Sequence, residues 1–558
     1  MATMAILQRT FSFILIFSIA LHLKSLFAME TDSGAELKYL ELIHEANEFT
    51  PDEEYDYIVV GGGTAGCPLA ATLSENYSVL VLERGGDQHS HPNIIRQENV
   101  ANNALPADDE NSPSQAFTSE DGVPGLVRGR VLGGSSMINF GFYSRGDDYF
   151  FKNTGIEWDM DSVKTAYEWV EETLVHRPDN VSTWESSVRD ALLEVGVLPD
   201  NGNTLDHLVG TKVSGSTFDS TGNRHGAVEL LNKANPNNLR VIVHATVDRI
   251  IFSSSESSGP SVVRVVYHDS HGKSYQVGIR ENGEVILSAG AFGSPQLLLV
   301  SGVGPSQNLT SLEIPVVHDQ PFVGQYMIDN PRINLALMLP FSVVDSGTPV
   351  VGITGKGSYI ETTSSSTPFT SPVSPLYFPY PYPPVNISMG YFFGKVSNPT
   401  SAGSLWLKSP SDVAITPSVR FNYFSKPEDV HQCADAVATY EKILKTKAME
   451  MYKFKDHGGE KYFQIVGRQI PENTSDFESM ATYCRKTVTT FYHYCGGCTV
   501  NKVVDSNLKV VGIGGLRVVD NSVFTSSPGT NPQATTMMLG RYMGVKIQQE
   551  RAGSDGDN

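Results

Sequence analysis

The stretch from residue 55 to residue 83 constrains the fold of this chain more than any other. An apolar run at 55–60 is followed by three glycines, Gly61, Gly63 and Gly66. A helix-compatible segment at 67–75 comes next, then a second apolar run at 78–82 and one acidic residue, Glu83. This order is the strand–helix–strand fingerprint of a dinucleotide-binding domain. The sequence therefore predicts a Rossmann-like α/β domain near the N-terminus.

Each glycine of the fingerprint has a physical reason. Gly61 permits the tight turn after the strand, Gly63 lets the backbone approach a pyrophosphate, and Gly66 lets the helix pack on the strand. The pyrophosphate would lie at the helix N-terminus, where free N–H groups and the helix dipole favour an anion, and Glu83 would bind a ribose. A glycine-rich turn without a ligand is the alternative, and the complete unit favours binding. The fingerprint does not distinguish NAD from FAD.

Length and charge limit the remaining possibilities. A chain of 558 residues exceeds the size of one compact core, so we expect two lobes or domains. The net charge of −20 and the lack of a basic run argue against a nucleic-acid partner. We expect a small-molecule substrate and a monomer.

Residues 1–28 are typical of a secretory signal peptide, with Arg9 before an apolar segment, 11–23, and Ala28 at the cleavage point. The alternative is an N-terminal membrane anchor, but the apolar segment is short and Lys24 follows it. The sequence predicts the secretory pathway, with an extracellular or vacuolar destination and no stable membrane anchor. Five glycosylation sequons agree with export, at Asn76, Asn180, Asn308, Asn386 and Asn473.

All five cysteines lie beyond the predicted signal peptide. In an oxidising compartment we expect at least one disulfide and one leftover thiol, but spacing alone does not give the connectivity. Cys67, directly after the first glycines, is more typical of a small packing residue than of a nucleophile. Cys495 and Cys498 form a CxxC pair, and a single pair is poor evidence for zinc. We predict no metal site.

Three further motifs identify the family. They are GRVLGGSSMIN at 129–139, GAFGSPQLLLVSGVG at 290–304 and LRVVDNSVFTSSPGTNPQATTMMLGRYMG at 516–544. Together and in this order they resemble the two sequence patterns and the C-terminal block of the glucose–methanol–choline (GMC) flavoprotein oxidoreductases, over roughly residues 53–548. Within that family the chain is most similar to the plant (R)-mandelonitrile lyase and lyase-like branch.

The resemblance implies FAD as the cofactor. Some members attach FAD covalently through a histidine where this chain has Ile138, so we expect non-covalent FAD. Pro532 suits the first turn of a helix predicted over 533–549, whose N-terminus would face the flavin. The residues implied to contact FAD are Gly61, Gly63, Thr64, Ala65, Gly66, Glu83, Arg84, Arg130, Gly133, Gly134, Ser135, Asn139, Val247, Asp520, Asn531, Pro532 and Gln533.

The same resemblance implies a catalytic pair. His493, in TTFYHYCGGC, matches the family's active-site histidine; the alternative is a structural histidine in a turn. Neutral His493 would take the substrate hydroxyl proton while hydride passes to flavin N5. Asn531 would hold the substrate oxygen, because an amide donates hydrogen bonds but takes no proton at working pH. Tyr492, Tyr494 and Cys495 are expected to line the substrate pocket.

Two reactions remain open at this site. In the lyases of this branch the catalytic pair resembles two histidines, whereas this chain has Asn531 as the partner of His493. Cys495 and Tyr492 also depart from the lyase pattern. The segment near Thr362 lacks the cysteine of the lyase loop. We therefore favour oxidation of a small aromatic or apolar alcohol over cleavage of a cyanohydrin with FAD as scaffold. A flavin-binding protein without catalysis is the third alternative.

The resemblance also implies a disulfide between Cys433 and Cys484. The proline- and aromatic-rich segment 369–393 is interpreted equally as a pocket lid or as a packed loop. The fold class is a mixed α/β and α+β chain, in which a substrate domain with an antiparallel sheet and helices is inserted into the FAD-binding domain. The expected segments are 53–150 and 236–330 for the FAD-binding domain, 151–235 as a mainly substrate and helical segment, 331–480 for the substrate-binding domain, and 481–548 as the C-terminal FAD-binding and active-site segment.

Overall fold

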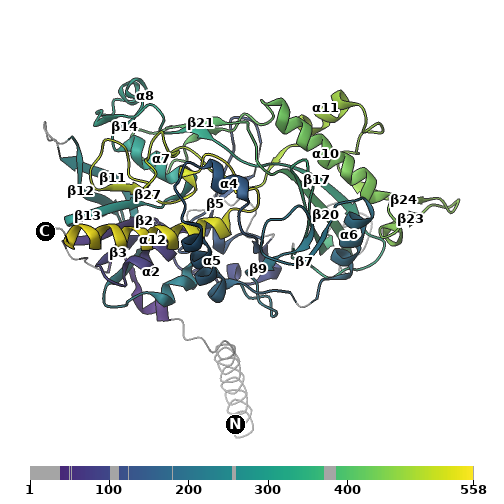
Figure 1. Ribbon diagram of the computed structural model, residues 1–558, viewed down its shortest axis with the longest axis horizontal. Helices are drawn as coiled ribbons and strands as arrows, with labels where there is room; N and C mark the ends of the chain where they lie inside the picture. Colours follow the sequence, from purple (N-terminus) through teal and green to yellow (C-terminus); the bar gives the residue numbers. More distant parts are fainter. Residues whose placement is uncertain are drawn as a thin grey trace, which may run out of the picture.

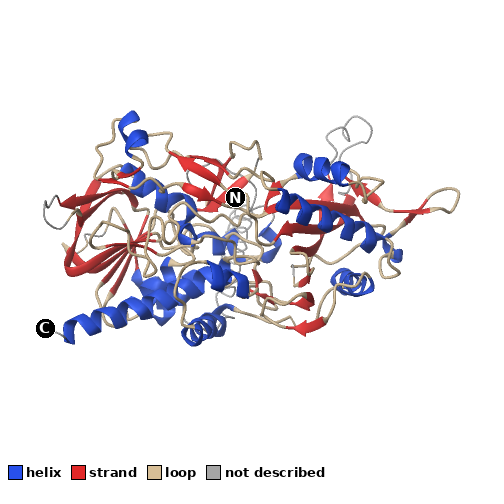
Figure 2. Cartoon of the chain, turned by 45° about the horizontal axis from the view of Figure 1, so that its top comes forward, coloured by secondary structure: helices blue, strands red, loops and turns tan. Residues whose placement is uncertain are grey.

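The computed structural model describes residues 38–48, 51, 53–100, 112–123, 125–178, 180–253, 259–347, 349–369 and 385–556. The predicted signal peptide lies outside these residues, as does most of the segment 369–393. The described chain is elongated, and two lobes are each built on a large sheet (Figures 1 and 2). This arrangement agrees with the predicted fold class.

The first lobe contains a mixed sheet with the fingerprint at its centre. Its parallel part runs β1–β10–β3–β2–β13, and β27 pairs in parallel with β13. The antiparallel hairpins β11–β12 and β12–β13 complete the edge. The strands are β1 (Ile43–Glu45), β2 (Glu54–Val60), β3 (Val79–Leu82), β10 (Leu239–Val243), β11 (Thr246–Ser253), β12 (Ser261–His268), β13 (Ser274–Leu287) and β27 (Leu516–Val518).

Helices from distant parts of the chain pack beside this sheet. The fingerprint helix α2 (Gly66–Leu73) is buried along its whole length, because α12 (Gln533–Gly556) and η5 (Ala227–Lys233) pack on it. Helix α12 also contacts α5 (Met160–Leu174), and α7 (Gly290–Val300) contacts β11. Figure 1 shows α12 in yellow along the lower side of this lobe.

The second lobe contains an antiparallel sheet in the order β25–β17–β20–β19–β18–β8, with β7 added in parallel beyond β8 and β26 paired to β17. Helices α6, α10 and α11 pack beside this sheet (Figure 2). The elements are β7 (Asp200–Asn203), β8 (Gly210–Val213), β17 (Pro331–Met338), β18 (Val350–Ile353), β19 (Ser358–Phe369), β20 (Val385–Val396), β25 (Gln464–Val466), β26 (Thr489–Thr490), α6 (Thr183–Glu194), α10 (Pro427–Leu444) and α11 (Phe477–Thr487).

The observed lobes differ from the predicted segments in three places. The FAD-binding sheet begins earlier than residue 53, because β1 pairs with β10. The segment 151–235 is shared: α5 and η5 pack on the first lobe, and α6 on the second. A three-stranded sheet, β16 (Gln325–Met327), β21 (Gly403–Trp406) and β22 (Ser418–Arg420), contributes Leu405 and Val419 to the first core. Residues 403–420 therefore belong with the FAD-binding lobe, because tertiary packing is not visible in local patterns.

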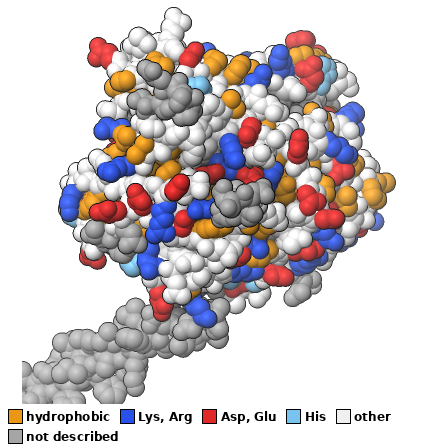
Figure 3. All heavy atoms as spheres, turned by 60° about the vertical axis from the view of Figure 1, so that its left-hand side comes forward, with side chains coloured by type: hydrophobic (Ala, Val, Ile, Leu, Met, Phe, Trp, Pro, Cys, Tyr) orange, Lys and Arg blue, Asp and Glu red, His pale blue; other side chains and the backbone are white. Residues whose placement is uncertain are grey.

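The described chain also contains a set of short helices and strands. They are η1 (Lys38–Leu42), η2 (Pro92–Ile95), η3 (Gln97–Asn99), β4 (Ser114–Phe117), β5 (Leu126–Gly129), η4 (Gly134–Met137), β6 (Phe142–Tyr143), α4 (Asp148–Asn153), β9 (Gly215–Ser216), β14 (Val303–Gly304), α8 (Ser306–Ser311), β15 (His318–Asp319), η6 (Glu450–Tyr452), β23 (Phe454–Lys455), β24 (Lys461–Tyr462) and η7 (Asn521–Val523). Among the described helices, none has the length and apolar character needed to cross a membrane. Acidic and basic side chains are interspersed on the face shown in Figure 3.

Candidate active site

The glycine-rich segments meet at the carboxyl edge of the parallel strands. The loop 61–65 follows β2, and the Gly133 N–H donates to the Gly62 carbonyl at 2.7 Å. The Ser288 N–H, directly after β13, donates to the Val60 carbonyl at 2.8 Å. In open α/β sheets this edge is where ligands bind. The fold therefore brings together three motifs that are far apart in the sequence.

Gly63 is the glycine that the protein's own packing does not explain. A Cβ atom at Gly61 would lie 2.6 Å from the Ser288 carbonyl oxygen, and one at Gly66 would collide with the Gly61 carbonyl. At Gly63 the nearest heavy atoms would be 3.8 Å away, and its φ is not positive. Space that a Cβ atom could fill, at a helix N-terminus, fits a pyrophosphate lying against the backbone. The residues present therefore fit FAD.

Gly63→Ala tests this fit. The variant is expected to fold, because the new methyl group meets no protein atom closer than 3.8 Å, but to bind FAD about tenfold more weakly or worse, roughly 1.4 kcal/mol. Flavin absorbance per protein after dialysis, with the melting temperature of the flavin-free form, measures both effects. Gly66→Ala is the matched variant and should not fold. Unchanged FAD affinity in Gly63→Ala would place the pyrophosphate elsewhere.

Glu83 is buried against the glycine loop. Its Oε2 accepts the Gly62 N–H at 3.0 Å and its Oε1 accepts the Gly85 N–H at 2.8 Å. Burial raises the pKa of Glu83, and these hydrogen bonds oppose the rise. The Ala245 N–H donates to the Glu83 carbonyl, which places Val247, at the start of β11, close to this end of the site. A ribose would meet the remaining lone pairs of the carboxylate.

The loop after β5 lies against the first glycine loop. Its Gly133 has φ +92° and Gly134 has φ +61°, and a Cβ atom at Gly134 would lie 2.8 Å from the Gly63 Cα. The Ser135 hydroxyl accepts the Gly129 N–H at 3.1 Å. Two predicted cofactor residues anchor the loop to neighbouring chain: Arg84 donates to the Gly129 carbonyl, and Arg130 donates to the Ser112 carbonyl. Thr64 and Ala65 lie just before α2, where Ala65 is the N-cap residue.

Asp520 joins the third motif to the C-terminal block. It is buried, and its Oδ2 accepts the Gly290 N–H at 2.8 Å and the Ser294 hydroxyl at 2.5 Å. Its Oδ1 accepts the Ser522 N–H. Burial raises the pKa of Asp520. The Thr536 N–H donates to the Pro532 carbonyl, so α12 begins directly after the predicted proline.

The hydrogen bonds around His493 fix which nitrogen is the base. The Asn330 amino group donates to the carbonyls of Val396 at 2.6 Å and Ser397 at 2.9 Å. The Asn330 Oδ1 must therefore face His493 Nδ1, 3.0 Å away, and accept a hydrogen bond from the Nδ1–H. Nε2 then carries the lone pair. The backbone N–H of His493 donates to Asp329 Oδ1 at 2.9 Å, which holds the backbone in place.

Asn531 is held by a buried ion pair that the sequence did not suggest. Lys395 Nζ donates to Asn531 Oδ1 at 2.8 Å and lies 3.6 Å from Glu361 Oε1. Lys395 and Glu361 come from β20 and β19, and both side chains are almost completely buried, at 0% and 3% exposure. Burial lowers the pKa of Lys395 to about 8 and raises that of Glu361. A signal was present only for Lys395, which follows the largely apolar run of β20.

One aromatic ring brings the base and two cations together. The Phe491 ring centre lies 4.7 Å from the His493 ring centre, 4.9 Å from Lys395 Nζ and 5.4 Å from Arg332 Cζ. Burial, Lys395 and Arg332 together hold the pKa of His493 well below its usual value. The imidazole is therefore neutral and able to accept a proton. These residues join the C-terminal segment to the second lobe.

The three predicted pocket residues are placed differently from one another. Tyr492 has φ +65°, which is strained for an aromatic residue, and Arg332 lies over its ring. Tyr494 packs against Phe292 in the first core, and its hydroxyl accepts the Val127 N–H. Cys495 is a buried free thiol in the same core. Tyr494 and Cys495 therefore pack inside the core, and the lining of a substrate pocket by these three residues stays a prediction.

The disulfide between Cys433 and Cys484 is present and joins α10 to α11. Cys67 is buried in α2, as expected of a packing residue, and its thiol donates to the Gly62 carbonyl.

Within the described chain no group of three metal-ligating side chains is found. Four sequon asparagines are exposed, and the side chain of Asn386 lies outside the described residues; the four are Asn76, Asn180, Asn308 and Asn473.

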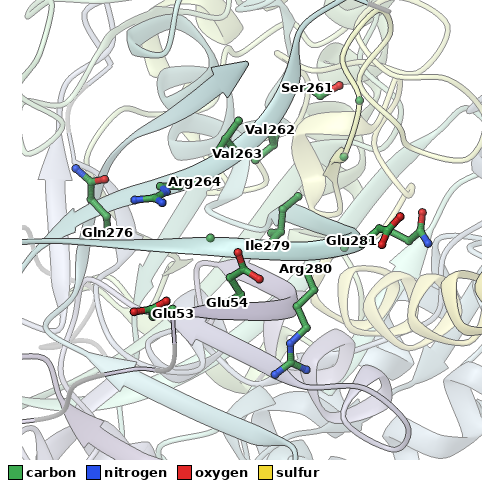
Figure 4. A pocket seen from close by; sticks show the side chains of 15 residues that line it. Glu53, Glu54, Ser261, Val262, Val263, Arg264, Gln276, Ile279, Arg280 and Glu281 are labelled. Carbon is green, nitrogen blue, oxygen red and sulfur yellow. The ribbon is translucent and has the colours of Figure 1, made fainter. Parts of the chain in front are cut away.

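A cavity of about 670 Å³ lies at the opposite end of the first sheet (Figure 4). It is lined by the start of β2 and by the irregular part of β13, where Arg264, Arg280 and Glu281 surround it. None of the predicted site residues lines it. Ligands of such sheets bind at the other edge, where the glycine loops lie, so this cavity is not the candidate active site.

Comparison with known proteins identifies the family. Two models described as GMC oxidoreductase match residues 55–332 and 399–540. A curated "(R)-mandelonitrile lyase-like" protein of Arabidopsis thaliana is 49% identical over 92% of this chain and 93% of its own length. "(R)-mandelonitrile lyase 3" of Prunus serotina is 47% identical over 97% and 93%, and "Protein HOTHEAD" of Arabidopsis thaliana is 43% identical over 90% and 89%.

Solved structures show the same fold. A formate oxidase structure superposes with a TM-score of 0.74 and 19% identity, over 90% of this chain and all of that chain. A pyridoxine 4-oxidase superposes with a TM-score of 0.74 and 21% identity, over 88% and 99%. The glycine loops meet at one sheet edge, and the family models and curated relatives span most of the chain, so the chain belongs to the GMC oxidoreductase family of FAD-dependent enzymes.

Proposed function

We propose that the protein oxidises the hydroxyl-bearing carbon of a small aromatic or apolar alcohol, with His493 as the base. The observation that carries this proposal is the fixed orientation of the imidazole: Asn330 binds Nδ1, which leaves the lone pair of Nε2 for the substrate proton. Burial and two nearby cations lower the pKa of His493, so the imidazole is neutral and can accept a proton.

Asn531 is the partner of His493 in this proposal. Its Oδ1 is occupied by Lys395, so only its amino group remains to meet a substrate. One N–H of that group faces Glu361, which the hydrogen bond helps to keep ionised, and the second donates to the substrate oxygen. The hydroxyl proton moves to His493 Nε2 as the carbonyl forms. FAD, when bound, takes the hydrogen and the electron pair of the C–H bond.

Cleavage of a cyanohydrin is the second candidate, favoured by a specific observation. Lys395 and Arg332 both lie within 5.4 Å of the Phe491 ring centre, beside the base. Two cations would stabilise an anion that leaves with the electron pair of a C–C bond while His493 takes the hydroxyl proton. Relatives named (R)-mandelonitrile lyase are 45–47% identical to this chain.

Anaerobic mixing of the purified holoenzyme with benzyl alcohol and, separately, with mandelonitrile tests both candidates. Bleaching of the flavin by the alcohol supports oxidation, and benzaldehyde release from mandelonitrile without bleaching supports cleavage. If neither flavin bleaching nor aldehyde release is seen with these two compounds or with a panel of other small alcohols, both candidates are contradicted, and a non-catalytic flavoprotein remains. Asn531→His is the informative variant: a gain of mandelonitrile cleavage would show that this position selects the reaction.

The pH dependence follows from the lowered pKa of His493. The neutral imidazole is the active form, and it is protonated only when the pH falls through this lowered value. The profile of kcat/KM is therefore expected to show no inflection near 6.5, the ordinary histidine value, and to decline only at lower pH. In Lys395→Met the decline should move to higher pH, because one of the depressing charges is removed. A wild-type inflection at or above 6.5 contradicts the assignment.

We further propose that the protein enters the secretory pathway and binds FAD without a covalent bond. The disulfide and the exposed sequon asparagines support export. A shift in mass on glycosidase treatment of the plant-expressed full chain would test export. Flavin that stays in the supernatant after acid precipitation of the protein would support non-covalent binding, and flavin in the pellet would contradict it.

A further inference from the structure

Arg224 is a buried cation whose hydrogen-bond partners are all neutral. Its side chain belongs to a residue that is only 3% exposed. Nε donates to the Ile94 carbonyl at 2.9 Å, and Nη1 donates to the Ser136 carbonyl at 3.1 Å and to Asn139 Oδ1 at 2.9 Å. Nη2 donates to the Asn139 carbonyl at 2.5 Å. The guanidinium also lies over the Phe218 ring, 4.4 Å from its centre.

No carboxylate compensates this charge. Across the described residues, no Asp or Glu oxygen lies within 4.0 Å of an Arg224 nitrogen. Arg145 is paired with Glu171 and Arg517 with Glu284, whereas the buried Arg128, like Arg224, has no carboxylate partner and donates to the neutral amide oxygen of Gln115. Burial alone lowers the pKa of Arg224, to about 9, and no charged group contributes. An unpaired buried charge is costly, so its presence indicates an anionic partner that the polypeptide does not supply.

The hydrogen bonds of Arg224 lead directly to the flavin-facing segments. Asn139 ends the glycine-rich loop after β5, and its Nδ2 donates to Gln533 Oε1 at 2.8 Å. Gln533 is the first residue of α12, and its Nε2 donates to the Phe142 carbonyl at 2.5 Å. Arg224, Asn139 and Gln533 therefore form a chain that joins the two segments expected to contact the flavin ring.

We propose that Arg224 is the fixed positive charge that stabilises negative charge on the bound flavin. The hydrogen bonds from its guanidinium also hold Asn139 in position. The proposal rests on FAD binding and not on the choice of substrate, so it can fail or succeed independently of the proposed reaction. The electrostatic interaction between a buried cation and a neighbouring anion stays strong, because water cannot reach the cation and screen its charge. The role is electrostatic positioning; Arg224 is not required to touch the substrate.

The test compares the holoenzyme with Arg224→Lys, Arg224→Gln and Asn139→Ala. The readouts are the affinity of the oxidised flavin for sulfite, which adds as an anion, and the two-electron reduction potential of the bound flavin. Arg224→Gln should weaken sulfite binding at least tenfold and lower the potential by the matching amount, about 30 mV or more. Arg224→Lys keeps the charge and should stay close to wild type. Asn139→Ala keeps the charge but removes an expected FAD contact, so its FAD content is measured separately, and its potential should shift clearly less than that of Arg224→Gln.

Two results would overturn the proposal. One is an unchanged potential in Arg224→Gln with full FAD content, and the other is an equal shift in all three variants, which would indicate packing alone. If Arg224→Gln does not retain FAD, Phe218→Glu places a carboxylate against the intact guanidinium, because the Phe218 ring lies directly beside it. That variant should lower the potential in the same direction, and an unchanged potential there would contradict the electrostatic role.

Discussion

His493→Ala is expected to lose on the order of 10²–10⁴-fold in kcat/KM, the usual contribution of a general base, while keeping its FAD. The loss follows from removal of the Nε2 lone pair that Asn330 orients through Nδ1. FAD binding should persist, because His493 is not among the residues expected to contact FAD. Steady-state kinetics with the substrate identified by flavin bleaching or aldehyde release, together with the flavin content, measure the two effects.

His457→Ala is the matched control. His457 is an exposed histidine in the loop between β23 and β24, far from the glycine loops in the sequence and on the outer end of the second lobe (Figure 1). Its replacement should leave kcat/KM unchanged. Activity of His493→Ala within a factor of a few of wild type would remove the base assignment, whichever reaction the enzyme performs.

Lys395→Met is expected to destabilise the protein by about 3–5 kcal/mol, because it leaves a buried carboxylate without its cation. Glu361 is almost completely buried, and Lys395 is the cation closest to it, at 3.6 Å. Burial already raises the pKa of Glu361, so the variant should take up a proton there and lose least stability at acid pH. Urea denaturation of the holoenzyme at two pH values measures the loss and its pH dependence.

The double variant Lys395→Met/Glu361→Leu separates charge from packing. Replacing both partners of a buried ion pair by apolar side chains is often close to neutral, so most of the stability should return. Activity should not return, because Asn531 still lacks the donor that fixes its amide. A double variant no more stable than Lys395→Met would show that the pair contributes through shape and not through charge.

Local sequence patterns predicted the parts of the site that lie within one strand–loop–helix unit. The glycine loop and the helix that begins after Pro532 depend on neighbours a few residues away, whereas His493 was singled out only through the family resemblance. The disulfide between Cys433 and Cys484 was available only through the family resemblance and is confirmed. These elements were accessible because backbone geometry and residue type are coupled over short distances.

The partners of the catalytic residues could not be predicted in this way. Asn330 lies 163 positions from His493, and Lys395 lies 136 positions from Asn531. Which side of β20 carries Lys395 depends on strand register, and the register is set by pairing with β19. The same reason explains why the lobe boundaries were misplaced: residues 403–420 look like part of a strand-rich domain until their packing partners are known.

The position of β27 has a consequence for biosynthesis. This strand pairs with β13, and the helix that follows it, α12, covers the helix of the first glycine loop. Both lie far along the chain from the first glycine loop, so the nucleotide-binding lobe cannot close around its cofactor until they have been synthesised. Capture of the flavin must therefore follow synthesis of α12, and removal of β27 and α12 should leave an open lobe that does not retain FAD.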